Sequence, residues 1–159
     1  MTQCSEQGFS LVEVLVAMAL SAVVLMGGVT ALQVSARFAQ QGRLAAKALA
    51  LAQSRVEAKR SVRWEALLLD DLDLDGRVDL MMMDDGQGAD VSAGDGVYSA
   101  RWEGDGVTLD WTVAPDHASP LAAAGFVTIR VAASYEGLGG IRTVTIGTVR
   151  ANPVFVGSR

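Results

Sequence analysis

The sequence is poor in the residues on which disulfide bonding, soft metal ligation and nucleophilic catalysis depend. Its 159 residues include one cysteine, Cys4, and one histidine, His117. A single cysteine cannot build a disulfide framework, and without further cysteines or histidines it indicates no zinc site. The sequence also has no glycine-rich phosphate-binding loop. We therefore expect a protein that is not an enzyme.

Proline is absent before Pro115, so nothing in that part of the chain forces a helix to break. Residues from Phe9 to about Arg60 are mostly Ala, Leu, Val, Gln, Lys and Arg, which are mainly good helix formers. They predict one long helix. Gly27 and Gly28 interrupt its apolar half and leave two interpretations open. They mark either a bend or melting point, or a place where neighbouring helices pack closely.

Charge is absent from Val14 to Ala36. About 20 apolar residues span a bilayer as a helix, and the apolar core of a cleaved secretory signal is shorter. The segment therefore predicts a single membrane span. Glu13 stands immediately before it, and a carboxylate in hydrocarbon is costly and rare unless it has a function. Glu13 is thus a candidate functional residue.

Residues 8–17, GFSLVEVLVA, combine a glycine, a phenylalanine, a short apolar spacer and Glu13 with the start of the apolar helix. This pattern resembles the prepilin signature of type IV pilins and type II secretion pseudopilins. The resemblance implies that residues 1–8 are a leader, which a membrane prepilin peptidase removes after Gly8. Phe9 would then become the N-methylated first residue. Other pilin or pseudopilin subunits are the implied partners, and Glu13 is expected to pair with the terminal amine of a neighbouring subunit.

Physical chemistry supports that use of Glu13, because a carboxylate buried among packed apolar helices needs a partner of opposite charge. The alternative is a glutamate that reaches the membrane interface from the end of a plain anchor. The resemblance places the helix in the inner membrane, with the remainder outside the cytoplasm and later in a pilus or pseudopilus. The charge count alone favours the opposite orientation, since residues 1–8 carry no base and the first bases are Arg37 and Arg43.

The second half of the helix, residues 37–63, has an amphipathic pattern that predicts one face packed on the rest of the protein. The expected buried positions are Phe38, Ala45, Leu49, Ala52 and Val56. A row of bases recurs at multiples of four: Arg43, Lys47, Arg55 and Lys59. This row is either a solvated face or a surface for anionic lipid or an acidic partner. The Leu-Ala-Gln-Ser-Arg-Val-Glu run within residues 48–60 resembles the helix end of PilV-type minor pilins and minor pseudopilins.

After Arg63 the pattern changes to long loops rich in Asp and Gly at 70–96, followed by strand-like runs. The predicted strands are Gly96–Trp102, Val107–Val113, Phe126–Ser134 and Ile141–Val149. The last two are joined by a glycine-rich turn at 137–140 and should form a hairpin. The fold class expected is α+β, in which a long N-terminal helix packs on a small antiparallel sheet. The expected parts are the leader 1–8, the membrane or filament-core helix 9–36, its amphipathic half 37–63 and a β-rich head at 64–159.

The first part of the Asp-rich loops, residues 71–79, has the spacing of a calcium loop. Ca²⁺ takes about 6–8 oxygen ligands, and alternating carboxylates before a glycine can converge on it. The expected ligands are Asp71, Asp73 and Asp75, the backbone carbonyl of Arg77, and Asp79. Met82 stands where an EF-hand has its closing glutamate, so the pattern is closer to the short loops of dockerins. The alternative is a solvated acidic turn without an ion.

A second acidic cluster follows, with Asp84, Asp85, Asp90 and Asp95. It resembles a segment of secreted β-sandwich modules in which aspartates satisfy loop backbone groups through Asx turns. We expect that structuring role here, with a further ion site as the alternative. Residues 81–83, three methionines, should form a core plug or a strand.

Together these features predict a minor type IV pilin-like structural subunit, with a type II secretion minor pseudopilin as the alternative. A different class remains open, a membrane-anchored calcium-binding adhesin or binding module in which the helix is only an anchor. The formal net charge of −5, with nine aspartates and one base between Asp70 and Asp95, argues against a nucleic-acid partner.

Overall fold

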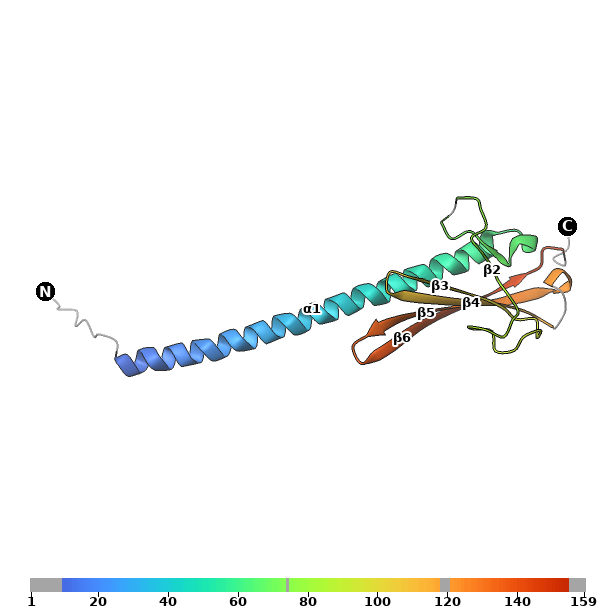
Figure 1. The fold of residues 1–159 in the computed structure, drawn as a ribbon. Coiled ribbons are helices and arrows are strands. Elements are labelled where there is room, and N and C mark those ends of the chain that lie inside the picture. Colours follow the sequence, from blue (N-terminus) through green and yellow to red (C-terminus); the bar gives the residue numbers. More distant parts are fainter. Residues whose placement is uncertain (1–9, 74, 118–120, 155–159) are drawn as a thin grey trace. The chain divides into compact units, whose positions relative to one another are not determined.

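The computed structural model describes residues 10–73, 75–117 and 121–154. One helix is followed by two small strands and then by four long strands (Figure 1). The elements are α1 (Leu11–Ser61), β1 (Leu69–Asp70), β2 (Leu80–Met81), β3 (Tyr98–Gly104), β4 (Val107–Pro115), β5 (Phe126–Gly137) and β6 (Gly140–Ala151). Short 3₁₀ helices occupy Trp64–Ala66 and Leu121–Ala123. The predicted α+β class is confirmed.

The predicted long helix is confirmed as α1, which continues through Gly27 and Gly28 without interruption. A methyl group added at either glycine would meet nothing within 4 Å. The described part of this chain therefore gives no steric reason for glycine at these positions.

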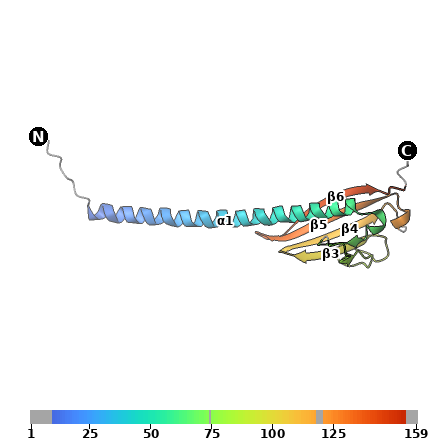
Figure 2. The same ribbon diagram turned by 90° about the horizontal axis from the view of Figure 1, so that it is seen from above.

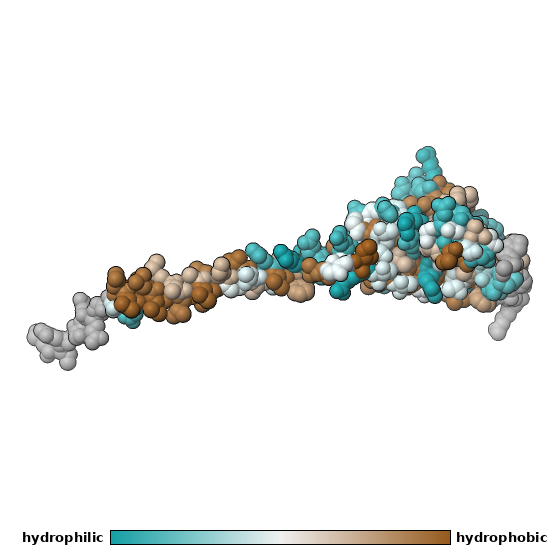
Figure 3. Space-filling model, turned by 60° about the horizontal axis from the view of Figure 1, so that its bottom comes forward, coloured by the Kyte–Doolittle hydropathy of each residue, from teal (hydrophilic) through white to brown (hydrophobic). Residues whose placement is uncertain are grey.

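The chain divides into two units, Met1–Gln40 and Gln41–Arg159. In the first unit, every described side chain from Ser10 to Gln40 is exposed. Figure 3 shows the apolar part of α1 as a largely hydrophobic surface. The second unit contains the rest of α1 and all the strands.

The four long strands form one antiparallel sheet in the order β3-β4-β5-β6. Two-residue loops join its two outer hairpins, so Gly104 pairs with Val107 and Gly137 with Gly140. In the first loop, Asp105 and Gly106 both have positive φ, of 54° and 77°, as the favoured Asp-Gly hairpin turn requires. The four predicted strands and the predicted hairpin are confirmed, and their ends differ by a few residues.

The core of the second unit lies between one face of this sheet and the C-terminal half of α1, which runs along the sheet in Figure 2. Alternate residues of β4 and β5 supply the sheet side of the core: Val107, Leu109, Trp111, Val113, Val127, Ile129, Val131 and Ala133. The helix contributes a stripe of Ala48, Ala52, Val56 and Lys59. Small alanines on this stripe let the helix lie close to the sheet, whose largest buried side chain is Trp111.

The expected buried stripe is therefore only partly correct. Ala52 and Val56 are buried and Ala45 is partly buried, whereas Phe38 is 62% exposed and Leu49 is 40% exposed. Phe38 belongs to the first unit, in which no described side chain is covered. Leu49 lies beside the stripe, because the helix turns Ala48 toward the sheet in its place.

The methionine run contributes to both strand and core. Met81 ends β2, Met82 is 3% exposed in the core, and Met83 forms an isolated bridge with Ser99 at the edge of β3. The predicted strand or core plug is thus confirmed at Met81 and Met82.

Candidate functional site

The first acidic loop brings three of its predicted ligands together. Asp71, Asp73 and Asp79 each offer a carboxylate oxygen, and these oxygens lie within 4.8 Å of one another. Asp75 is not in this group, and its Oδ1 accepts the backbone N–H of Arg77 at 2.8 Å. An anionic centre of three converging carboxylates is a donor set that suits a hard cation such as Ca²⁺.

The same carboxylates also hold the loop backbone. Asp71 accepts the N–H groups of Asp75 at 3.2 Å and Gly76 at 2.8 Å, and Asp79 Oδ2 accepts the N–H of Leu72 at 2.6 Å. Gly76 has a φ of 87°, which favours glycine. Each carboxylate has about four lone-pair sites, so these bonds leave acceptor capacity for an ion.

The second acidic cluster is organised in a similar way. Carboxylate oxygens of Asp84, Asp90 and Asp95 lie within 4.8 Å of one another, and Asp85 is outside the group. All four accept backbone N–H groups within the loop; Asp84, for example, accepts two, from Gly94 at 2.6 Å and Gly96 at 2.8 Å. These bonds are the loop-structuring interactions that the sequence predicts for this cluster.

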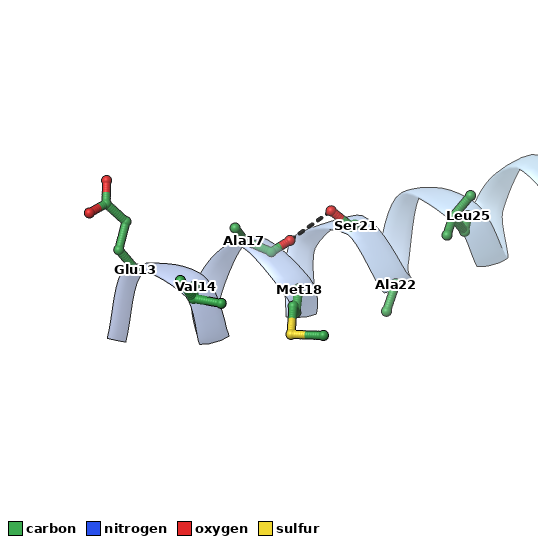
Figure 4. A pocket seen from close by; sticks show the side chains of 7 residues that line it. All are labelled: Glu13, Val14, Ala17, Met18, Ser21, Ala22 and Leu25. Atoms are coloured by element: carbon green, nitrogen blue, oxygen red, sulfur yellow. Dashed lines mark hydrogen bonds between the residues drawn. The ribbon is translucent and has the colours of Figure 1, made fainter. Parts of the chain in front are cut away.

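Glu13 lies in the first turn of α1, where the partial positive charge of the helix N-terminus favours a carboxylate. It borders a shallow groove on one side of the helix, whose other lining residues are Val14, Ala17, Met18, Ser21, Ala22 and Leu25. In Figure 4 the Glu13 carboxylate points away from the helix and toward none of those six side chains. The one polar group further along, the Ser21 hydroxyl, donates to the Ala17 carbonyl at 2.7 Å.

Apart from Ser21 the groove is lined by apolar side chains, and Glu13 is the one charge at its end. Leu11, Met18 and Met26 of the same helix are 79%, 67% and 75% exposed. A helix that is apolar all round is stable in lipid or among other helices rather than in water. Within the described residues, α1 is also the one helix long and apolar enough to cross a membrane.

The residues predicted for processing, Gly8 and Phe9, lie outside the described residues. A scan against protein families matched residues 4–29 to the prokaryotic N-terminal methylation motif. This motif indicates a type IV pilin-like protein. The matched range includes Gly8, Phe9 and Glu13, and with the apolar helix it fits a membrane-anchored pilin. No curated protein and no solved structure matched the chain.

Sequence reasoning missed a buried charge cluster in the second unit. Asp70 is 3% exposed, and its two oxygens meet Arg55 at 3.0 Å and Lys59 at 2.8 Å. The indole N–H of Trp111 donates to the same carboxylate at 3.0 Å. Lys59 also donates to the carbonyl oxygens of Leu67 at 2.7 Å and Leu69 at 3.3 Å.

Two members of the basic row thus face inward and form intramolecular ion pairs, which corrects the expectation of a solvated or lipid-facing row. A third member, Lys47, pairs with Asp105 in the β3–β4 turn at 2.9 Å. Burial lowers the pKa of Lys59, and the neighbouring Asp70 carboxylate opposes that shift. The i, i+4 spacing of Arg55 and Lys59 was visible in the sequence, but their partner lies in a loop that only the tertiary fold brings to them.

The end of α1 is also held by the last strand. Arg150 of β6 donates to the carbonyl oxygens of Lys59, at 2.7 Å, and Val62. Lys59 lies in the last turn of α1, whose carbonyls have no intrahelical partners, and Val62 directly follows the helix. These bonds hold the end of α1 to β6, and the ion pairs of Arg55 and Lys59 hold it to Asp70.

Proposed function

We propose that this chain is a minor structural subunit of a type IV pilus and that it has no catalytic role. In this proposal a prepilin peptidase cuts after Gly8, Phe9 is N-methylated, and the helix 9–36 holds the subunit in the inner membrane. The subunit then enters the filament or its priming tip, with its head outside the cytoplasm. The observation that carries the proposal is the methylation motif at residues 4–29, which runs into the uncharged and exposed segment of α1 from Val14 to Ala36.

The exposed helix supports assembly rather than simple anchoring for a physical reason. An anchor needs only apolar residues, whereas this helix carries Glu13 in its first turn, beside a largely apolar groove. A carboxylate there gains most if a neighbouring subunit supplies a terminal amine when the helices pack. A type II secretion minor pseudopilin would use the same helix, and the two systems differ in their partners.

Processing is the first test of this proposal. We expect that co-expression of the full chain with a prepilin peptidase removes Met1–Gly8 and adds one methyl group, measured as the intact mass. A Gly8→Val variant should keep the full-length mass, because the residue before the cut is altered. If the wild-type mass is unchanged by the peptidase, the chain is a plain membrane-anchored module and the pilin proposal fails.

We further propose that the first acidic loop binds Ca²⁺ and that the ion stiffens the head. Support comes from the convergence of Asp71, Asp73 and Asp79, which would hold the ion together with backbone or water oxygens. Without a cation the three carboxylates repel one another across 4.8 Å or less. This proposal does not depend on the pilin proposal and also suits the alternative of a calcium-binding adhesin.

Calcium binding has a matched pair of test variants in the same loop. Asp73 and Asp75 each accept the N–H of the residue two positions later, but only Asp73 belongs to the converging group. In the full chain in detergent micelles, saturating Ca²⁺ should raise the melting temperature. At a Ca²⁺ concentration a hundred times Kd, binding should add about 2.7 kcal/mol to the free energy of unfolding. Asp73→Ala should abolish this response and Asp75→Ala should retain it. An equal response in wild type and Asp73→Ala would show that the group of Asp71, Asp73 and Asp79 does not bind Ca²⁺.

A further inference from the structure

The outer edge of β6 is a strand edge that no described residue protects against pairing. The loop between β5 and β6 has two residues, so the Gly137–Gly140 pair that flanks it is hydrogen-bonded. Hydrogen-bonded pairs alternate along an antiparallel ladder, which directs the even-numbered residues of β6 toward β5. Asn152 continues this series, since its N–H donates to the Gly125 carbonyl at 2.8 Å. The odd-numbered residues therefore direct their N–H and C=O groups away from the sheet.

These edge residues share three properties: they are exposed, uncharged and without proline. They are Ile141, Thr143, Thr145, Gly147, Val149 and Ala151. Exposure of Gly147 is exposure of backbone, because glycine has no side chain. Within the described part of the chain, no backbone hydrogen bond outside the β5–β6 ladder involves any of the six.

The opposite edge of the same sheet, β3, is protected. Met83 already exchanges two backbone hydrogen bonds with Ser99, at 3.0 and 2.8 Å. The next two positions that face outward on β3 are the charged residues Arg101 and Glu103. Cover and charge are ordinary means of preventing edge-to-edge association. Both are present on β3, whereas the outward-facing positions of β6 are uncharged and have no such cover among the described residues, which distinguishes the two edges.

We propose that β6 is a docking edge for an extended, acidic segment of another protein, which adds to the sheet as a fifth strand. Alternating N–H and C=O groups over six positions are satisfied best by another strand. The acidic character of the docking segment is inferred from Arg142, which is exposed on β6 and forms no salt bridge among the described residues. The strand carries no carboxylate, and its other base, Arg150, is bound to the end of α1.

The same charges disfavour a second copy of β6 as the occupant. Arg142 and Arg150 lie on one face of the strand, so self-pairing would bring four arginines onto one face without a carboxylate on either strand. Like charges on neighbouring strands are destabilising, and opposite charges stabilise the pair. An acidic strand therefore fits this edge, whichever filament or membrane system the chain serves.

Defined peptides test the proposal on the full chain in detergent micelles. The probe is a labelled, end-capped peptide Thr-Val-Thr-Asp-Thr-Val-Thr, compared by fluorescence anisotropy with the same peptide carrying Lys in place of Asp. The Asp peptide should bind about two- to fivefold more tightly, and Arg142→Glu should reverse that order. When the peptide pairs with β6, its Asp lies opposite Arg142 and on the same face of the sheet. Arg142 directs its own N–H and C=O groups to β5, so the Asp likewise directs its backbone groups away from β6. The two threonines that flank the Asp therefore direct their N–H groups to β6. N-methylation of those two threonines should abolish binding, whereas N-methylation of the two valines should leave it intact.

Variants of the edge give the second arm of the test. Thr145→Pro removes an outward N–H without removing a β5–β6 bond, and it should lower the affinity for the Asp peptide by at least about fivefold. Thr145→Ala keeps the N–H and should bind as the wild type does. The proposal is overturned if neither peptide binds, if threonine and valine methylation act alike, or if sedimentation shows self-association that Thr145→Pro abolishes. If Thr145→Pro lowers the melting temperature, the variant disturbs the fold, and the comparison of the methylated peptides on the wild-type chain is then the test of the proposal.

Discussion

Asp70→Asn should lower the free energy of unfolding of the second unit by about 3–5 kcal/mol, because it removes the counter-charge of two buried cations. The side chains of Asp70 and Lys59 are 2% and 1% exposed, and that of Arg55 is 11% exposed. The substitution preserves shape and leaves the amide oxygen able to accept from Trp111. The loss is therefore electrostatic. It can be measured by denaturant unfolding of the full chain in detergent micelles, followed by tryptophan fluorescence, since all three tryptophans lie in the second unit.

A surface ion pair between β3 and β4 provides the control. Asp110 pairs with Arg101 at 2.7 Å, but the Arg101 side chain is 52% exposed, so Asp110→Asn should cost about 0–1 kcal/mol. Lys59→Met should cost less than Asp70→Asn, because Asp70 then keeps Arg55 and Trp111 as partners. Equal losses for Asp70→Asn and Asp110→Asn would show that the buried cluster contributes no more than a surface pair.

The sheet could be predicted from the sequence because its signals are local. Alternation of apolar and polar residues from Val107 to Val113 corresponds to alternate burial against α1. The glycine-rich turn at 137–140 fixed the last hairpin in the same way. The convergence of Asp71, Asp73 and Asp79 also follows from short-range spacing, although the outward turn of Asp75 does not.

The buried charge cluster could not be predicted, because it depends on contacts far apart in the chain. Asp70 and Trp111 are separated by 41 positions, and nothing in a row of bases on a helix tells which of them will face a carboxylate. The buried face predicted for the second half of the helix was partly wrong for a related reason. Periodicity identifies a face of a helix, but Phe38 shows that it does not tell where the covering sheet begins.

Glu13→Gln should leave processing intact and remove the subunit from filaments. In the proposed assembly, Glu13 pairs with the terminal amine of a neighbouring subunit among apolar helices. Loss of one partner of a buried pair costs about 3–5 kcal/mol, which corresponds to at least about a hundredfold loss of incorporation. The measurement is the ratio of this chain to other subunits in sheared filaments, with the intact mass of the membrane fraction as evidence of cleavage.

Ser21→Ala is the matched control, because Ser21 lines the same groove and its hydroxyl bonds only to the helix backbone at Ala17. It should enter filaments as the wild type does. The two variants together separate charge pairing from general disturbance of the groove. If Glu13→Gln assembles at the wild-type level, the carboxylate of the wild type meets water at the membrane interface in the unassembled subunit and remains in water in the filament. Apolar packing alone would then place the helix, and the charge before it would have no part in assembly.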